Sequence, residues 1–318
     1  MKTRRLGANG PEISVVGYGG WEAGGTAWGP NESDDAVVAA MRAALDAGID
    51  WIDTAEVYGD GENERLVGLS VAGRRDEVTI ASKVAPSEEG SGFLPEQVRA
   101  ACDASLGRLG TDRIDLYQLH WPDGTGVPLE DTWGAMAALQ DAGKVRWIGV
   151  SNFSRELIAR CEAIRHVDSL QPEFSMLNRE HAATVAWCAT NGTGVVSYGP
   201  LAFGLLTGAI GPDTVFPPGD WRTPSDEPED PDEVDLFSPD RFPAALEAVA
   251  AIAKIAERVG VTTAQLALAW NAAQRGVTSA IAGSRNPDHV RSNAAAGDVE
   301  LDEATLTELD AVLVGGGF

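Results

Sequence analysis

The sequence predicts an α/β fold, a (β/α)8 TIM barrel with an N-terminal β-hairpin and a long loop after strand 7. Eight short apolar runs alternate with helix-length amphipathic segments. These runs are continuously apolar, which is typical of parallel strands covered on both faces. An open doubly wound sheet is the alternative, but "GYGGWEAGG" (17–25) lacks the GxGxxG spacing of that fold. We therefore expect a single barrel domain over residues 1–318.

Each predicted strand precedes a predicted helix. The fixed φ angle of Pro95 suits the first turn of a helix, and Gly143 suits a C-terminal cap. The strand and helix pairs are, in chain order, 14–20 with 33–47, 49–55 with 62–69, 77–84 with a helix that begins at Pro95, 113–121 with 128–143, 145–153 with 154–164, 168–174 with 179–192, 193–201 with 243–259, and 276–284 with 287–296.

Two segments lie outside these eight units. "RRLGANGPEIS" (4–14) predicts a β-hairpin with Asn9-Gly10 as its turn, and we expect it to close the floor of the barrel. Residues 205–242 form a long loop rich in proline, glycine and acidic residues. A loop of this length is typically either disordered or functional, often as a lid.

The chain is strongly acidic, with a formal net charge of −24 at pH 7 and a pI near 4.4. Such a surface repels nucleic acids and anionic membranes, so we expect neither as a partner. No run of about 18 apolar residues predicts a membrane span, and the first residues lack the apolar core of a signal peptide. The sequence predicts no particular oligomeric state.

Three cysteines, Cys102, Cys161 and Cys188, fall in helix-like segments. An odd number of cysteines is no disulfide framework, and no histidine stands at zinc-ligand spacing. We expect small apolar residues in helices, no bound metal, and a reducing cytoplasmic location.

Polar residues stand where the predicted strands end. Asp53, Lys83 and His120 end three successive strands, and Tyr58 follows the first of them closely. Each alone has a structural explanation, such as a turn cap, a hydroxyl bonded to the backbone, a rim lysine or a core histidine. Active sites of TIM barrels are built at the carboxyl ends of the strands. Four such residues at one end of one barrel therefore indicate a catalytic site.

The chemistry of these four side chains is mutually consistent. A tyrosine has a reference pKa of about 10, and a nearby ammonium lowers that pKa by favouring the phenolate. A carboxylate would keep the lysine charged and fixed, and the histidine could orient a carbonyl oxygen. A positioned acid contributes roughly 10² to 10⁴ in rate. We therefore expect Tyr58 to donate a proton.

The sequence around these residues resembles the aldo-keto reductase superfamily. The catalytic segments that carry the resemblance are "DTAEVYG" (53–59), "ASK" (81–83) and "LYQLHWPD" (116–123), and the cofactor segments are "GVSNF" (149–153), "QPEFSMLNR" (171–179), "YGPLAFGLLTG" (198–208) and "IAGSRNPDHVRSN" (281–293). "LYQLHWPD" and "FPPGDWR" (216–222) are most similar to a bacterial subgroup with stress-response and inositol-operon reductases.

The resemblance implies stereospecific hydride transfer from NADP(H) to an aldehyde or ketone, without a metal. It implies Tyr58 as the general acid, Lys83 and Asp53 as groups that tune its pKa, and His120 as the group that orients the carbonyl. The implied substrate residues are Trp21, Tyr58, His120 and Trp121, with core packing as the alternative role of the two tryptophans. The implied cofactor residues are Gly20, Trp21, Asp53, Ser151, Asn152, Gln171, Tyr198, Gly199, Pro200, Leu201, Gly204, Leu206, Gly283, Ser284, Arg285, His289 and Asn293.

Within this set, the resemblance implies that Ser151, Asn152 and Gln171 hold the nicotinamide carboxamide, with Tyr198 stacked on the ring. It places the pyrophosphate along "GPLAFG" (199–204).

At the adenosine end, Arg285 is the expected partner of a 2′-phosphate and Asn293 of adenine, and Arg291 adds positive charge nearby. His289 stands where many relatives carry arginine or glutamine. NAD(H) use is therefore possible beside NADP(H).

Two other functions are compatible with these motifs. One is a polyol or sugar dehydrogenase that works in the oxidative direction. The other is a cofactor-sensing regulatory subunit like the potassium-channel β proteins, which share the fold.

Overall fold

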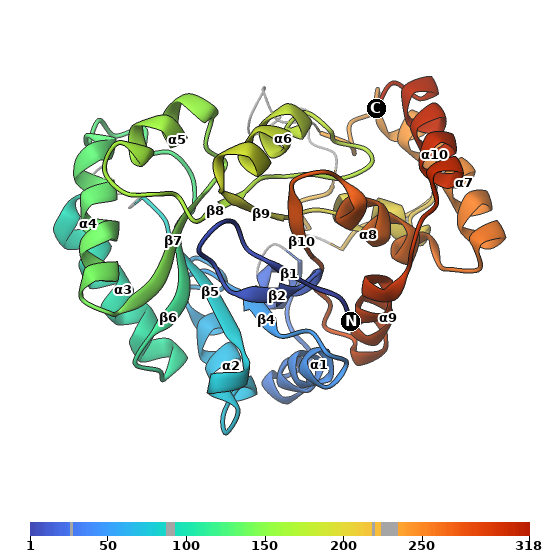
Figure 1. Cartoon of the computed structure of the whole chain (residues 1–318). Coiled ribbons are helices and arrows are strands. Elements are labelled where there is room, and N and C mark those ends of the chain that lie inside the picture. The colour runs from blue at the N-terminus through green and yellow to red at the C-terminus, as the bar shows by residue number, and fades with distance from the viewer. Residues whose placement is uncertain (26–27, 87–92, 218–219, 224–234) are drawn as a thin grey trace.

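Eight parallel strands close into a barrel in the computed structural model, which describes residues 1–25, 28–86, 93–217, 220–223 and 235–318 (Figure 1). This confirms the predicted (β/α)8 fold. Around the barrel the described strands are β10 (Val277–Ile281), β3 (Val16–Gly19), β4 (Trp51–Asp53), β5 (Thr79–Val84), β6 (Ile114–Leu119), β7 (Val145–Ser151), β8 (Ser169–Gln171) and β9 (Gly194–Ser197).

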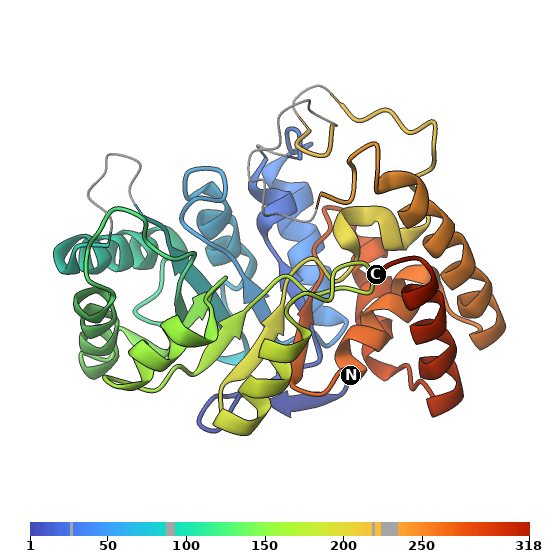
Figure 2. The same cartoon turned by 90° about the horizontal axis from the view of Figure 1, so that it is seen from above.

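Helices surround the barrel on its outside (Figures 1 and 2). The helices are α1 (Asp34–Asp46), α2 (Glu62–Ser70), α3 (Pro95–Leu109), α4 (Leu129–Asp141), α5 (Arg155–Glu162), α6 (Ala182–Asn191), α7 (Phe242–Val259), α8 (Thr263–Ala273), α9 (Pro287–Ala295) and α10 (Glu303–Gly315), with short 3₁₀ turns η1 (Trp21–Gly24), η2 (Arg75–Glu77), η3 (Ala202–Thr207) and η4 (Ala296–Asp298). The α8 and α10 helices are additions to the eight expected units. Side-chain caps fix several starts: Ser33 accepts from the N–H of Ala36, and Thr262 and Gln265 form a capping box at α8.

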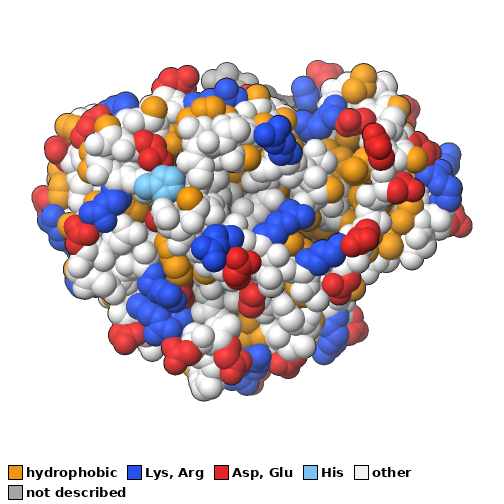
Figure 3. Space-filling view, viewed as in Figure 1, with side chains coloured by type: hydrophobic (Ala, Val, Ile, Leu, Met, Phe, Trp, Pro, Cys, Tyr) orange, Lys and Arg blue, Asp and Glu red, His pale blue; other side chains and the backbone are white. Residues whose placement is uncertain are grey.

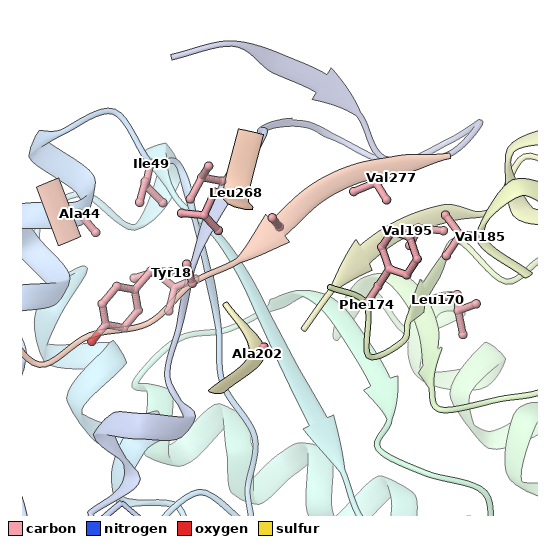
Figure 4. Close-up of a cluster of buried hydrophobic side chains, with 14 of the residues drawn as sticks. Tyr18, Ala44, Ile49, Leu170, Phe174, Val185, Val195, Ala202, Leu268 and Val277 are labelled. Atoms are coloured by element: carbon pink, nitrogen blue, oxygen red, sulfur yellow. The ribbon is translucent and has the colours of Figure 1, made fainter. Parts of the chain in front are cut away.

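The main apolar layer lies between strands and helices (Figure 4). Tyr18 on β3, Met41 on α1 and Leu268 on α8 are fully buried in it. Because side chains alternate along a strand, the other half of each strand faces the barrel interior. On β4 this half contains Trp51 and Asp53, so the apolar interior leads directly to a charged side chain at the strand's carboxyl end.

A small hairpin of β1 (Thr3–Arg5) and β2 (Glu12–Ser14) closes one end of the barrel, as expected (Figure 1). Leu6 and Ile13 are buried against the interior cluster that contains Trp51. The prediction that Asn9-Gly10 alone forms the turn of the hairpin is wrong. Arg5 pairs with Glu12, so the loop spans 6–11, and the positive φ angle of 61° falls on Gly7. Packing of Leu6 into the barrel favours this longer loop over the short turn.

The surface and the cysteines agree with the sequence analysis. Basic and acidic side chains are intermixed on the face seen in Figure 3. The three cysteines are free and buried, and burial raises the pKa of each thiol to about 12. In the described part of the chain, we find no helix with the length and apolarity that crossing a membrane requires. The sequence also has an acidic stretch at 225–235, of which residues 225–234 lie outside the described residues.

Candidate active site

The four residues expected to form the catalytic group lie together at the end of the barrel opposite the hairpin. Lys83 Nζ lies 2.5 Å from Asp53 Oδ1 and 3.0 Å from the Tyr58 hydroxyl. The ring centroids of Tyr58 and His120 are 5.6 Å apart. The structure thus brings Asp53, Tyr58, Lys83 and His120 into one cluster.

Further contacts hold the lysine and the aspartate rigidly. Lys83 also donates to the carbonyl of Thr54 at 3.1 Å, so it has three oxygen acceptors around its ammonium. Gln171 Nε2 donates to Asp53 Oδ2 at 2.8 Å. Lys83 is fully buried and Asp53 is 2% exposed. A buried ion pair needs such additional hydrogen bonds, because its desolvation is otherwise uncompensated.

The net electrostatic effect on Tyr58 differs from the expectation. Burial raises the pKa of Tyr58 and outweighs the opposing effect of the Lys83 ammonium, so the pKa lies above its usual value rather than below it. Burial also acts to lower the pKa of Lys83, but Asp53 and Tyr58 outweigh it and leave the pKa raised. The cluster therefore consists of a protonated phenol beside a charged ammonium.

His120 is neutral in this environment. Burial, with a smaller contribution from Lys83, holds the pKa of His120 well below its usual value. Its Nδ1 atom is buried with no hydrogen-bond partner among the described residues. A proton on Nδ1 would be an unsatisfied buried donor, so the tautomer with the proton on Nε2 is favoured.

The expected nicotinamide residues form a connected group next to His120. Asn152 donates to the His120 carbonyl at 3.3 Å and accepts from the Tyr198 hydroxyl at 3.1 Å. The backbone of Asn152 has a φ angle of 62°, in the left-handed region that asparagine adopts more readily than most residues. The Ser151 hydroxyl donates to the carbonyl of Gln171 at 2.8 Å. These side chains lie beside the catalytic cluster and are mutually ordered.

The expected diphosphate segment follows β9. Its backbone is unusual, because Ala202 and Phe203 have φ angles of 47° and 53° although neither is a glycine. Leu206 is fully buried in the core. In the same segment Tyr198 and Gly199 are half-buried and Pro200 is buried.

The expected adenosine residues gather where β10 leads into α9. The Tyr18 hydroxyl donates to the Ser284 carbonyl at 3.0 Å, and Ser284 Oγ lies 3.5 Å from His289 Nδ1. Asn293 is 6% exposed on α9. Arg291 is exposed and paired with Asp288 at 2.7 Å, as an ordinary helix-surface charge would be.

Glycines allow close approach between this region and the catalytic end. A Cβ atom on Gly283 would lie 2.3 Å from the Gly19 carbonyl, and one on Gly20 would lie 2.2 Å from Asn63 Oδ1. The N–H of Gly20 donates to the Asp53 carbonyl at 2.8 Å. These glycines hold β3 against both neighbouring strands.

A family model described as "Aldo/keto reductase family" matches residues 15–314. The chain belongs to the aldo/keto reductase family. It is 37% identical over 300 residues to aldo-keto reductase YhdN of Bacillus subtilis, an alignment that covers 92% of this chain and 87% of that protein.

Solved structures of this family are also similar. A glycerol dehydrogenase from Gluconobacter oxydans matches with a TM-score of 0.85 and 31% identity, covering 99% of this chain and 95% of the other. An aldo/keto reductase from Klebsiella pneumoniae, solved in complex with NADP and acetate, matches with a TM-score of 0.74 and 31% identity, covering 98% and 96%.

An aromatic cluster lies beyond the carboxyl ends of β3 and β9 in this aldo/keto reductase, and only Trp21 among its members was expected from the sequence to contact substrate or cofactor. Trp21 stacks on Trp221 at 5.7 Å and meets Trp28 edge-on at 5.3 Å, and Phe203 lies 4.8 Å from Trp221. These ring pairs join the segments after β3 and β9. The "FPPGDWR" motif was the available signal for Trp221.

Two other side chains, Trp121 and Arg222, lie near the carboxyl ends of the strands in this aldo/keto reductase. Trp121 is 38% exposed, and its ring lies 4.6 Å from that of His120. Arg222 pairs with Asp220 and donates to the Phe203 carbonyl at 3.1 Å. The described residues 220–223 of the long 205–242 loop thus contact the proposed diphosphate segment.

Proposed function

We propose that this chain is an NADP(H)-dependent oxidoreductase that reduces aldehydes and ketones to alcohols, with Tyr58 as the general acid. Its family supports the reaction class, and the NADP complex of the Klebsiella pneumoniae relative supports the cofactor. The observation that carries the proposal is the 3.0 Å contact between Tyr58 and an ammonium that is itself fixed by Asp53.

The residues present fit this cofactor. Arg285 lies just before the N-terminus of α9, whose first N–H groups favour anions, and an arginine suits a 2′-phosphate. Leu201, with a φ angle of −95°, is followed by Ala202 with a φ angle of 47°, and such a right-handed and left-handed pair is a main-chain pattern that can bind anions. Tyr198 and Asn152 lie beside His120, where the nicotinamide would be held. When bound, NADPH supplies the hydride.

The side chains of the cluster have separable roles in this proposal. Tyr58 stays protonated because burial raises its pKa, so its hydroxyl can donate a proton to the substrate. Lys83 then stabilises the phenolate that remains, because its ammonium lies 3.0 Å from the oxygen. His120 donates from Nε2 to the carbonyl oxygen of the substrate. Asp53 keeps Lys83 charged and in place.

A substrate panel with both cofactors tests the proposal. We expect NADPH oxidation with small aldehydes such as nitrobenzaldehyde and methylglyoxal, and none without a carbonyl compound. The proposal is wrong if the purified protein binds NADPH but consumes none of it with any carbonyl compound in the panel. That result would instead favour a cofactor-sensing role.

A polyol dehydrogenase is the second candidate, because the relative from Gluconobacter oxydans is a glycerol dehydrogenase. The same panel distinguishes it when glycerol, inositol and glucose are supplied with NADP⁺. Oxidation of one of these faster than reduction of the corresponding carbonyl, compared as kcat/KM at one pH, would favour this candidate.

A further inference from the structure

The guanidinium of Arg285 is surrounded by oxygen atoms of this chain. Its Nη1 donates to the carbonyls of Gly29 and Pro30 at 3.1 and 2.9 Å, and its Nη2 donates to the carbonyl of Trp28 at 2.9 Å. Its Nε lies 3.5 Å from Oε1 of Glu22. Residues 28–30 and η1 thus meet Arg285 from two sides.

The arrangement leaves one edge of the guanidinium for an anion. Five N–H groups are available in an arginine, and the three carbonyls use two on Nη1 and one on Nη2. The remaining N–H groups are one on Nε and one on Nη2, the two nitrogens that an arginine can present as a fork to two phosphate oxygens. Glu22 faces this fork.

Glu22 is the carboxylate that a phosphate at this fork would encounter. The nearby Asp220 is paired with Arg222 at 2.6 Å, which balances its charge. The Glu22 side chain is 31% exposed, so it is neither locked in the core nor fully screened by water. Its carboxylate competes for the N–H groups that a phosphate requires.

We propose that Glu22 sets the cofactor preference of this protein by opposing the 2′-phosphate at Arg285, an inference that rests on the NADP(H)-dependent function above. NADP(H) carries a dianionic phosphate at this position, and that phosphate has to displace the carboxylate from the fork. NAD(H) carries a neutral hydroxyl there and meets no such repulsion. A carboxylate at this end of the cofactor is also what NAD(H) sites commonly use. Glu22 therefore reduces the ratio of the NADP(H) affinity to the NAD(H) affinity, so that the protein can also use NAD(H).

Binding of two cofactor fragments tests this inference without turnover. Titration calorimetry with 2′,5′-ADP and with 5′-AMP compares ligands that differ in the 2′-phosphate. In Glu22→Gln the side-chain shape and the three carbonyl contacts to Arg285 remain, while the negative charge is lost. We expect 2′,5′-ADP to bind about three- to tenfold more tightly, with the affinity for 5′-AMP changed less than about twofold.

Glu257→Gln is the matched control, because it makes the same change in net charge at an exposed position on α7. Equal tightening in the control, or in both ligands, would show a general charge effect and overturn the inference. No tightening in Glu22→Gln, with NADPH turnover intact, would overturn the inference alone. A wild-type protein that binds neither fragment and turns over neither cofactor would overturn the proposed function as well. Glu22→Ala, checked by circular dichroism, provides a second variant with the same expected direction.

Discussion

Lys83 Nζ lies 2.5 Å from Asp53 Oδ1, and both side chains are almost completely buried. The two belong to neighbouring parallel strands, so the barrel itself brings them together. Neither charge has access to bulk water that could replace its partner. The stability of the fold and the function of the site therefore depend on the same ion pair.

Asp53→Asn should lower the free energy of unfolding by about 3–5 kcal/mol, because it leaves the Lys83 ammonium buried without a counter-charge. The double variant Asp53→Asn/Lys83→Met should recover part of that loss. Urea denaturation of the two single variants and the double variant measures the coupling. Strictly additive losses would contradict a coupled pair. Asp46→Asn, whose partner Arg74 is on the surface, should change stability little.

Tyr58→Phe should lower kcat by about 10² to 10⁴, because it removes the proton donor and little else. The dissociation constant for NADPH should stay within about twofold, since the phenol is assigned to the carbonyl substrate. Tyr117→Phe on β6 is the matched control and should keep its activity, because Tyr117 packs in the layer outside the barrel. A Tyr58→Phe variant with most of its turnover would remove Tyr58 from the acid role.

The rate of reduction should stay flat through neutral pH and fall only at alkaline pH. Burial raises the pKa of Tyr58 above its usual value of about 10, and the acid form is lost as pH rises through that pKa. The oxidative direction needs the phenolate, so its rate should rise with pH over the same range. Profiles of kcat/KM in both directions check this. A tyrosine-dependent break near pH 7 would show that the net pKa shift is downward.

His120 should make the protein less stable in mild acid. Its folded pKa lies well below the value of about 6.5 for an unfolded histidine, so the unfolded state binds more protons below that pH. The contribution of His120 to stability is present above pH 6.5 and is lost as pH falls, by up to about 1.4 kcal/mol for each pH unit. Urea denaturation at several pH values between 7 and 5 should show that the free energy of unfolding falls less steeply with decreasing pH for His120→Gln than for wild type. His166→Gln, which alters a partly exposed histidine, is the comparison, and an equal effect there would contradict the assignment.

Trp221→Ala should speed the release of NADPH by about three- to tenfold, because it removes ring contacts worth about 0.5–1.5 kcal/mol each. The lost contacts are those with Trp21, Trp28, Phe203 and Phe237. Stopped-flow displacement of bound NADPH measures the rate. Trp147→Ala near the hairpin is the control, and an unchanged release rate in Trp221→Ala would make residues 220–223 a surface feature only.

The proximity of the four proposed catalytic side chains could be predicted because they stand at or just beyond strand ends. Asp53, Lys83 and His120 end successive parallel strands, and parallel strands place their ends at one edge. The direction of the Tyr58 pKa shift could not be predicted in the same way. It depends on the balance between burial and one ammonium, and the sequence names the ammonium but not the depth of burial.

Hydrogen bonds from side chains to main-chain carbonyls could not be predicted from the sequence either. Arg285 donates to the main-chain carbonyls of residues more than 250 positions away. Every residue has such a carbonyl, so the sequence does not show which ones accept. The hairpin loop shows the same limit, because Asn9-Gly10 is a good local turn signal that the packing of Leu6 overrides. Neither outcome follows from local preference alone.

The hairpin that plugs the barrel has a consequence for the passage of small molecules. Because Leu6 and Ile13 are buried in the barrel interior at the hairpin end, we expect small molecules to approach the lysine and the phenol from the opposite end. In the proposed function, substrate, product and nucleotide would share that end of the barrel. We therefore expect a sequential order of binding, in which the molecule that lies deepest binds first and leaves last.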